Sequence, residues 1–342
     1  MKQPLVAIKC PVYNYEPYLR DCLEGFVMQQ TDFPFVAIVH DDASTDHSAD
    51  IIREYAAKYP DIIHPIYETE NQYSKKDGSL TKIMNAAIEA TGAPYIALCE
   101  GDDFWTNPHK LQKQVDFLET HPDIGLCYTD YDTCDAKGTI INKACFANGI
   151  NKIPVSFAEH LVAQGYIAPM TWLYRKTVYD ALQDIQRQPV VDGSFVVALE
   201  FFLHSAVYFV NEVTATYRIH EGSASRPLTV AQWIKYRKGV YEIQQQYAKQ
   251  DSETLGLLPI FKVNEILELL PLALEADLNQ YIDEYNAKAE DLHLDTNLCV
   301  MVFRFKKDAR DARSSYAYRI GKFLLKPFRW IRLFISKNRA IV

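Results

Sequence analysis

The first 130 residues alternate short, mainly apolar runs with longer stretches in which apolar positions recur at helical spacing. The apolar runs predict strands at residues 5–8, 35–39, 62–67 and 95–99. The stretches between and after them predict helices at 17–30, 46–59, 80–90 and 109–120. Strands that are apolar along their whole length are buried on both faces, so the pattern indicates an α/β fold with a mostly parallel central sheet covered by helices on both sides.

The pattern becomes less regular further along the chain. It predicts a strand at 125–129 and a helix at 194–205. From about residue 228 onward it is helical, and Pro271 is expected to bend an amphipathic helix there. We therefore expect one main domain over 1–225, with halves of about 1–130 and 131–225, and a helical C-terminal extension over 226–342.

Charge separates the end of the chain from the rest. Residues 304–342 carry twelve Lys or Arg and two Asp, whereas the preceding residues carry 24 basic and 42 acidic side chains. A basic tail on an acidic body suggests an anionic partner for the tail. Residues 319–334 mix cations with large apolar side chains, which is typical of a segment lying in a membrane interface. A nucleic acid is not expected as a partner, because the acidic body would repel it.

Cysteine usage and hydropathy indicate where the protein works. The seven cysteines are scattered without a C-x-x-C pair, which argues against a disulfide framework or a structural zinc site and favours a reducing cytoplasm. The N-terminus leads directly into a predicted strand without a signal peptide, and no apolar stretch reaches about 18 residues. We expect a cytoplasmic protein that is peripheral on the inner face of the membrane.

Polar clusters follow the predicted strands, where ligands bind in parallel sheets. Residues 11–14 (Pro-Val-Tyr-Asn) follow the first strand, and Tyr13 could stack on a base. Residues 41–46 (Asp-Asp-Ala-Ser-Thr-Asp) follow the second strand. Ser44 or Thr45 is expected to cap the next helix. Capping does not require Asp41 and Asp42, which could accept hydrogen bonds from a uracil imide or a ribose hydroxyl.

A third cluster, residues 100–103 (Glu-Gly-Asp-Asp), follows the fourth strand. Three carboxylates in four residues repel one another unless a cation or solvent separates them. Mg²⁺ and Mn²⁺ prefer oxygen ligands and bind through one or two carboxylates plus substrate phosphates. Gly101 would let the backbone approach a ligand. An acidic turn before a helix is the simpler alternative.

The order and spacing of these three clusters resemble the nucleotide-sugar-binding half of the GT-A fold, and in particular family 2 of the inverting glycosyltransferases. Residues 211–220, from Asn211 to His220, also resemble that family, so the resemblance covers roughly residues 4–225. It implies a metal-dependent enzyme that transfers a sugar with inversion from a nucleotide-diphosphate donor, most simply a UDP-sugar, to a saccharide or lipid-linked acceptor in cell-surface polysaccharide synthesis.

The resemblance also implies roles for the clustered residues. Pro11, Tyr13 and Asp42 would hold the uridine, and Asp102 would be the principal ligand of Mn²⁺ or Mg²⁺. Glu100 or Asp103 would contact the ribose or complete the metal's shell. Three lysines could contact the diphosphate from a loop near the donor, although a solvated loop explains them equally well: Lys75, Lys76 and Lys82.

Inverting transfer needs a general base for the acceptor hydroxyl. In the family this is an Asp near the start of a helix, some eighteen residues before the Glu of the distal element. That count from Glu212 reaches Ser194, so a two-residue insertion would make Asp192 the base, with Glu200 in reserve. Alternatively, Asp192 only begins the turn before a helix capped by Ser194.

Further residues could complete the site. Arg218 and His220 could stabilise the charge that develops on the diphosphate leaving group. The aromatics Trp105, Trp172 and Tyr174 could line the acceptor site or simply belong to the core.

Two alternatives to a glycosyltransferase are a sugar nucleotidyltransferase and a non-catalytic binding module. A sugar nucleotidyltransferase would be expected to carry a glycine-rich loop after the first strand, but the first glycine is Gly25. The missing G-x-G-x-x-G motif also counts against a dinucleotide dehydrogenase. A non-catalytic nucleotide-sugar-binding module is the alternative from a different class, and the displaced Asp192 keeps it open.

Overall fold

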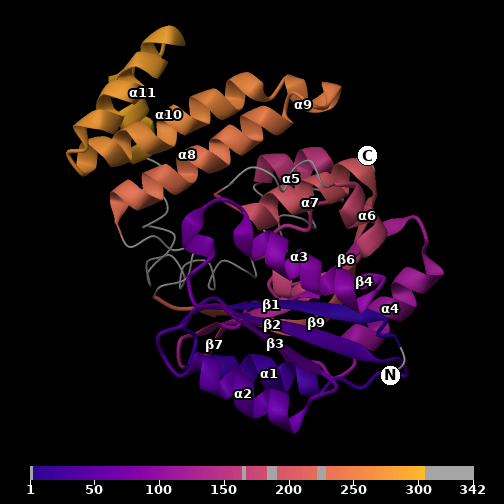
Figure 1. The fold of residues 1–342 in the computed structure, drawn as a ribbon. Helices are drawn as coiled ribbons and strands as arrows, with labels where there is room; N and C mark the ends of the chain where they lie inside the picture. The colour runs from indigo at the N-terminus through magenta and orange to yellow at the C-terminus, as the bar shows by residue number, and fades with distance from the viewer. Residues whose placement is uncertain (1–2, 164–166, 183–190, 222–228, 305–342) are drawn as a thin grey trace, which may run out of the picture. The chain divides into compact units, whose positions relative to one another are not determined.

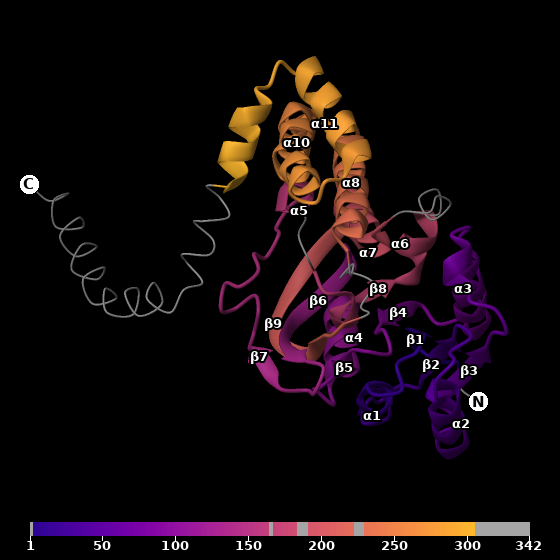
Figure 2. The same cartoon turned by 90° about the vertical axis from the view of Figure 1, so that its left-hand side faces the viewer.

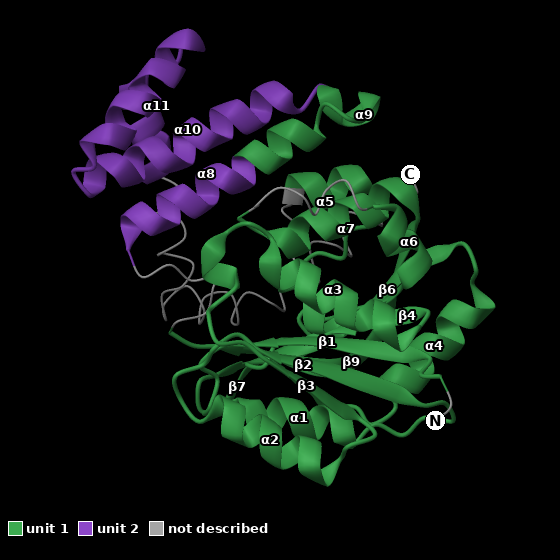
Figure 3. Ribbon diagram, viewed as in Figure 1, with its two compact units in different colours: residues 1–228, 242–255 green, residues 229–241, 256–342 purple. Residues whose placement is uncertain are grey.

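The computed structural model describes residues 3–163, 167–182, 191–221 and 229–304. Contacts divide the chain into two compact units (Figure 3). Unit 1 consists of residues 1–228 and 242–255, and unit 2 of residues 229–241 and 256–342. The basic tail segment 319–334 lies outside the described residues. The boundary expected near residue 225 stays a prediction.

Unit 1 is built on one sheet, which in the described part of the chain has nine strands. The strand order is β3-β2-β1-β4-β8-β6-β9-β5, and β7 pairs with β6. β3, β2, β1 and β4 are mutually parallel, β8 is antiparallel to both neighbours, and β9 is parallel to β6. The strands are β1 (Val6–Val12), β2 (Phe35–Asp41), β3 (Ile63–Tyr67), β4 (Tyr95–Leu98), β5 (Phe104–Trp105), β6 (Ile124–Asp135), β7 (Ile140–Asn142), β8 (Leu173–Arg175) and β9 (Ala206–Ile219).

Helices cover both faces of the sheet in unit 1. In Figure 1, α1 and α2 lie on one face of the strands β1 to β3, and α3 lies on the other. The helices are α1 (Leu19–Val27), α2 (Ser48–Lys58), α3 (Ser79–Thr91), α4 (Lys110–Thr120), α5 (Phe157–Ala163), α6 (Lys176–Ala181), α7 (Gly193–His204) and α9 (Ser252–Leu255). The eight elements expected in the first 130 residues are therefore present, in the expected order. The expected strand at 125–129 and helix at 194–205 correspond to β6 and α7.

One expectation about β1 was wrong. Pro11 was expected to follow the strand, but β1 continues through Pro11 to Val12 beside β2. The pairing of β1 with β4 ends at Lys9, so no ladder partner on that side needs an N–H at Pro11. The Pro11 carbonyl instead accepts a hydrogen bond from Gly101 N.

Unit 2 is helical. It contains α10 (Leu258–Glu275), α11 (Asn279–Asp291) and the first part of α8 (Val230–Tyr247), whose last part belongs to unit 1. Pro271 lies inside α10, which remains one continuous helix around it. Buried side chains including Ile234, Leu269 and Tyr285 form the core of this unit. None of the helices in the described ranges combines the length and the apolar character needed to cross a membrane.

A buried histidine should make unit 1 sensitive to acid. The His160 side chain is fully buried against Phe195 and Phe202, and neither ring nitrogen has a hydrogen-bond partner among the described residues. Burial lowers the pKa of His160 to about 3. An unfolded histidine titrates near pH ~6.5. The unfolded chain therefore takes up this proton first, so stability falls as the pH drops from about 6.5 towards 3.

We expect His160→Leu to remove this part of the acid sensitivity. Between pH 7 and pH 4 the native protein should lose about 3 kcal/mol more unfolding free energy than the variant. Urea unfolding at a series of pH values measures the difference. His109→Leu, at an exposed position, is the control and should keep the native pH dependence. Parallel stability curves for the native chain and His160→Leu would contradict the prediction.

Candidate functional site

The loops after β1 and β2 are tied together at the carboxyl ends of these strands. Asn14 N donates to Ser44 Oγ at 3.0 Å, and Thr45 N donates to Asn14 Oδ1 at 2.8 Å. Ser44 therefore serves the neighbouring loop and does not cap α2, contrary to expectation. Asp46 instead accepts from Ser48 N at 2.9 Å and from Glu16 N at 3.0 Å. The first two polar clusters thus form one connected surface.

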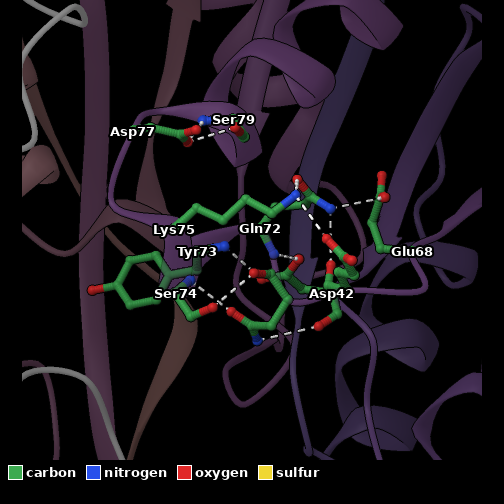
Figure 4. A network of polar contacts seen from close by, with 10 residues as sticks. Asp42, Glu68, Gln72, Tyr73, Ser74, Lys75, Asp77 and Ser79 are labelled. Atoms are coloured by element: carbon green, nitrogen blue, oxygen red, sulfur yellow. Dashed lines mark hydrogen bonds and ion pairs between the residues drawn. The ribbon is translucent and has the colours of Figure 1, made fainter.

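Asp42 organises a third loop at the same edge (Figure 4). Its buried carboxylate accepts from Gln72 N at 2.7 Å and from Tyr73 N at 3.0 Å. Its own N–H donates to Val12 O at 2.9 Å. Asp42 therefore fixes the loop after β3 relative to β1, and a ligand would meet it in an already fixed orientation.

Asp41 and Tyr13 are placed differently from Asp42. Asp41 ends β2 and is buried, yet its Oδ1 has no hydrogen-bond partner in the described part of the chain. A buried acceptor without a hydrogen bond lowers the stability of the fold, and a bound ligand with a hydrogen-bond donor would remove that cost. Tyr13 follows β1 and is 44% exposed, so its ring is accessible for stacking.

The lysines of the loop after β3 have partners within that loop. Lys75 donates to Gln72 Oε1 and pairs with Glu70 at 3.2 Å. The Lys76 ammonium lies 3.4 Å from the centre of the Tyr73 ring. Both side chains are exposed, as is Lys82.

The acidic turn, residues 100–103, directly follows β4 and packs closely on β1 and α1. A Cβ at Gly101 would lie 3.0 Å from Val12 and 3.1 Å from Tyr15. Gly101 is therefore needed for packing of the turn, and its role in the approach of a ligand stays a prediction. Gly101 N also donates to Pro11 O at 3.1 Å, which joins this turn to the first cluster.

Arg218 and His220, at the end of β9, hold the acidic turn from the other side. Arg218 N donates to Asp103 Oδ1 at 2.8 Å, and Arg218 Nε donates to Asp102 O at 3.0 Å. Its Nη2 donates to Asp21 Oδ2 at 2.7 Å. His220 Nε2 lies 3.0 Å from Asp102 Oδ2. The hydrogen bonds of Arg218 thus fix the conformation of the turn, whereas His220 contacts the predicted metal ligand Asp102 directly.

The surroundings of the turn disfavour negative charge. Close protein surroundings, together with Asp102 and Asp192, raise the pKa of Glu100 to about 7 although its side chain still reaches solvent. Burial, followed by the charge of Asp102, holds the pKa of Asp103 well above its usual range. The hydrogen bond to Asp102 raises the pKa of His220. A bound cation would relieve the repulsion between these neighbouring carboxylates and favour their ionised form.

The turn offers ligands suited to a divalent cation. Asp102 Oδ1 is buried and has no hydrogen-bond partner among the described residues, while Glu100 and Asp103 lie within two positions of it. No group of three or more His, Cys, Asp or Glu side chains in the described ranges forms a complete metal site by itself. Mg²⁺ and Mn²⁺ sites commonly use one or two carboxylates and take the remaining oxygens from phosphates and water. The residues present therefore fit a metal that arrives with a diphosphate.

Asp192 lies at the start of α7, and its charge acts on Glu100. The structure therefore brings it into electrostatic range of the acidic turn. Its Oδ1 also accepts from Phe195 N at 2.9 Å and from Ser194 Oγ at 2.8 Å. Asp192 is thus the N-cap of α7, a position that the sequence suggested for Ser194.

Other sequence candidates are buried in unit 1. Glu200 is buried and accepts from Tyr247 OH at 2.5 Å, so it is poorly placed as a reserve base. The three aromatics suggested for an acceptor site are buried core residues: Trp105, Trp172 and Tyr174. Each indole N–H is already bonded, to Met170 O and Ile167 O respectively.

Two tyrosines were missed because an aromatic in a loop has no distinctive sequence pattern. Tyr18 lies with its ring centre 4.6 Å from that of His220 and 4.9 Å from the Arg218 guanidinium. Tyr15 lies beside the turn, where burial and then the charge of Asp102 raise its pKa. Together they form the wall of the turn on the β1 side.

The sequence matches the family model described as "Glycosyl transferase family 2" over residues 8–182. An uncharacterized protein of Mycobacterium tuberculosis is 33% identical over 216 residues, which are 61% of this chain and 57% of that protein. A candidate teichuronic acid biosynthesis glycosyltransferase of Bacillus subtilis, TuaG, is 30% identical over 141 residues, 41% of this chain and 52% of TuaG. The chain thus spans little more than half the length of these relatives.

Two solved structures share the fold at low sequence identity. S. aureus TarS 1–349 in complex with UDP-GlcNAc has a TM-score of 0.52 at 17% identity, covering 79% of this chain and 72% of that one. The mannosyltransferase PcManGT from Pyrobaculum calidifontis, in complex with GDP-Man and Mn²⁺, has a TM-score of 0.51 at 16% identity. That match covers 96% of this chain and 83% of PcManGT.

Proposed function

Because the chain belongs to glycosyl transferase family 2 and has the expected GT-A fold, we propose that it transfers a sugar from a nucleotide-diphosphate donor to a saccharide or lipid-linked acceptor, with inversion. The observation that carries the proposal is the hydrogen-bonded edge that joins the loops after β1, β2 and β4. At this edge, Gly101 N bonds to Pro11 O and Asp42 N bonds to Val12 O. The groups that we propose to bind the donor, from three strands, are thereby joined to the acidic turn.

The nucleoside would bind at the carboxyl ends of β1 and β2. Pro11 and Tyr13 would contact the base, with the exposed Tyr13 ring stacking on it. Asp41 Oδ1 and the fixed carboxylate of Asp42 would accept from the imide or ribose donors. We propose UDP as the nucleotide, in line with the UDP-GlcNAc that TarS binds.

The diphosphate would bind beside the acidic turn. Asp102, with Glu100 or Asp103, would hold Mn²⁺ or Mg²⁺, in line with the Mn²⁺ in the PcManGT complex. When bound, such a cation supplies charge stabilisation for the departing diphosphate. His220 would orient Asp102 and lie close to the leaving group, while Arg218 would act by holding the turn.

Asp192 would serve as the general base. Its N-cap contacts hold the carboxylate in place, and its charge already reaches the acidic turn. Asp192 would take the proton of the acceptor hydroxyl as the oxygen attacks the anomeric carbon on the face opposite the leaving diphosphate. A single displacement of this kind inverts the anomeric configuration.

The acceptor is proposed to belong to cell-surface polysaccharide synthesis, as the name of TuaG suggests for that relative. A lipid-linked acceptor would agree with peripheral attachment of the basic C-terminal segment to the inner face of the membrane. The net charge of +10 over residues 304–342 supports that attachment.

A panel of nucleotide sugars tests the proposal. In the presence of Mn²⁺ we expect slow hydrolysis of one donor, because water can replace the acceptor, and no turnover when the metal is chelated. Calorimetry with UDP and Mn²⁺ on the same protein gives the second readout. Metal-dependent binding without hydrolysis of any donor would favour a binding module, and the absence of both would refute the proposed function.

A further inference from the structure

The strand β7 leaves apolar side chains uncovered on both of its faces. Ile140 is 40% exposed and Ile141 is 52% exposed. Because successive side chains of a strand point to opposite faces, neither face of β7 is packed against the core. Ile150, in the loop that follows, is 50% exposed. In Figure 2, β7 and the chain after it lie at the margin of unit 1, beyond β9.

The exposed isoleucines are carried on a well-fixed backbone. Asp130, buried in β6, accepts from Phe146 N at 2.9 Å and from Ala147 N at 3.0 Å. Asp132 accepts from Ala144 N at 2.8 Å. Phe146 itself is buried in the core of unit 1. The segment therefore buries Phe146 and packs Ile153 against the core, but leaves Ile140, Ile141 and Ile150 outside, so the exposure of these three is a property of this framework.

The charge of the same segment is opposite to that of the body. Between residues 136 and 158 there is no Asp or Glu, but there are three lysines, all exposed: Lys137, Lys143 and Lys152. As a whole, the chain before the basic tail is strongly acidic, with 42 acidic and 24 basic side chains over residues 1–303. We call the six side chains Lys137, Ile140, Ile141, Lys143, Ile150 and Lys152 the hairpin surface.

The chemistry of the hairpin surface favours a lipid bilayer over a protein. Protein interfaces are enriched in Tyr, Trp, Phe, Met and Arg and depleted in Lys. The exposed residues of the segment 136–155 include no Tyr, Trp, Phe, Met or Arg. Aliphatic side chains enter the acyl boundary of a bilayer, while lysines remain among anionic headgroups.

We propose that the hairpin surface docks unit 1 onto a membrane containing anionic lipid. The isoleucines insert at the headgroup boundary, and the three lysines neutralise lipid phosphates. This contact is separate from the basic tail and requires no sugar donor. It therefore goes beyond the proposed function and can fail or hold independently of it.

Vesicle partitioning of the full chain tests the proposal. The vesicles contain phosphatidylcholine with or without about one third phosphatidylglycerol. The test variant is Ile140→Thr/Ile141→Thr, which keeps the β-branched side chains that suit a strand. The control is Ile260→Thr in α10, because Ile260 is 51% exposed, against 52% for Ile141. The tail is present in every sample, so a difference between the variants reports on β7.

We expect the double variant to bind anionic vesicles about tenfold more weakly than the native chain, because two apolar side chains no longer enter the bilayer. Ile260→Thr should bind like the native chain, and all three proteins should hydrolyse a soluble donor equally. A difference that persists at high salt supports insertion, since salt screens the headgroup attraction of the tail. Equal binding by both variants would overturn the proposal. So would light scattering that shows a native dimer and a monomeric double variant with unchanged vesicle binding, since a second copy would then cover the surface.

Discussion

Asp102→Asn is expected to reduce metal-dependent turnover of the donor by about 10³-fold. The substitution removes the buried carboxylate whose Oδ1 has no partner among the described residues. Asp102 Oδ2 lies 3.0 Å from His220 Nε2, and an Asn side chain can keep a hydrogen bond at this position. Initial rates of donor hydrolysis over a range of Mn²⁺ concentrations measure the loss, and calorimetry measures the weaker metal-dependent binding of UDP.

The fold should survive this change. The charge of Asp102 raises the pKa of Glu100 and of Asp103, so its removal relieves repulsion and should not lower the melting temperature. Asp21→Asn is the matched control, because Asp21 also bonds to Arg218 but is 58% exposed and lies outside the acidic turn. It should retain activity within a few-fold of the native rate. An Asp102→Asn protein with native metal dependence would rule out Asp102 as the principal ligand.

Asp192→Asn is expected to slow transfer to the acceptor by about 10² to 10⁴-fold, because the acceptor hydroxyl loses its general base. Hydrolysis of the donor by water should fall less, since water need not occupy the acceptor position. Comparing the two rates on the same protein therefore separates loss of the base from loss of the donor site.

The structure makes Asn the right replacement at this position. Asp192 caps α7 by accepting from Phe195 N, and Asn caps helices about as well as Asp. Asp192→Ala would also remove the cap, at a cost of about 1 kcal/mol. Ser194→Ala, which removes one hydrogen bond to Asp192 but keeps the carboxylate, should have a much smaller effect. If transfer and hydrolysis fall equally in Asp192→Asn, Asp192 is not the base.

The sequence predicts the first half of unit 1 well because β1 and β2 are buried almost throughout and apolar along most of their length. It could not predict β5 or β8, which have two and three residues and so carry no periodicity. β8 exists because Tyr95 and Ile96 of β4 pair with Arg175 and Tyr174, far along the chain. Pairings between distant segments leave no local signature.

The same limit applies to the candidate site. The three polar clusters could be found because each lies at or just after the end of a strand, and parallel strands end at one edge of the sheet. The structural roles of Asp42 and Arg218 could not be predicted from the sequence. Backbone N–H groups about thirty positions away occupy Asp42. The guanidinium of Arg218 is occupied by the Asp21 carboxylate of α1 and by the Asp102 carbonyl of the acidic turn. A sequence shows that an arginine is present, but not which partners already occupy its guanidinium group.

The bond between Arg218 N and Asp103 joins positions 115 residues apart. Closing so long a loop is slow and contributes nothing until both segments are in place, so the acidic turn should reach its final form late in folding. A partly folded chain would then have no competent donor site and could not consume sugar nucleotide. Conversely, a donor that binds only the finished turn stabilises the folded chain by mass action, by about 2.7 kcal/mol at a concentration 100 times its Kd. The supply of sugar nucleotide in the cell would in this way protect the protein from unfolding, as well as provide its substrate.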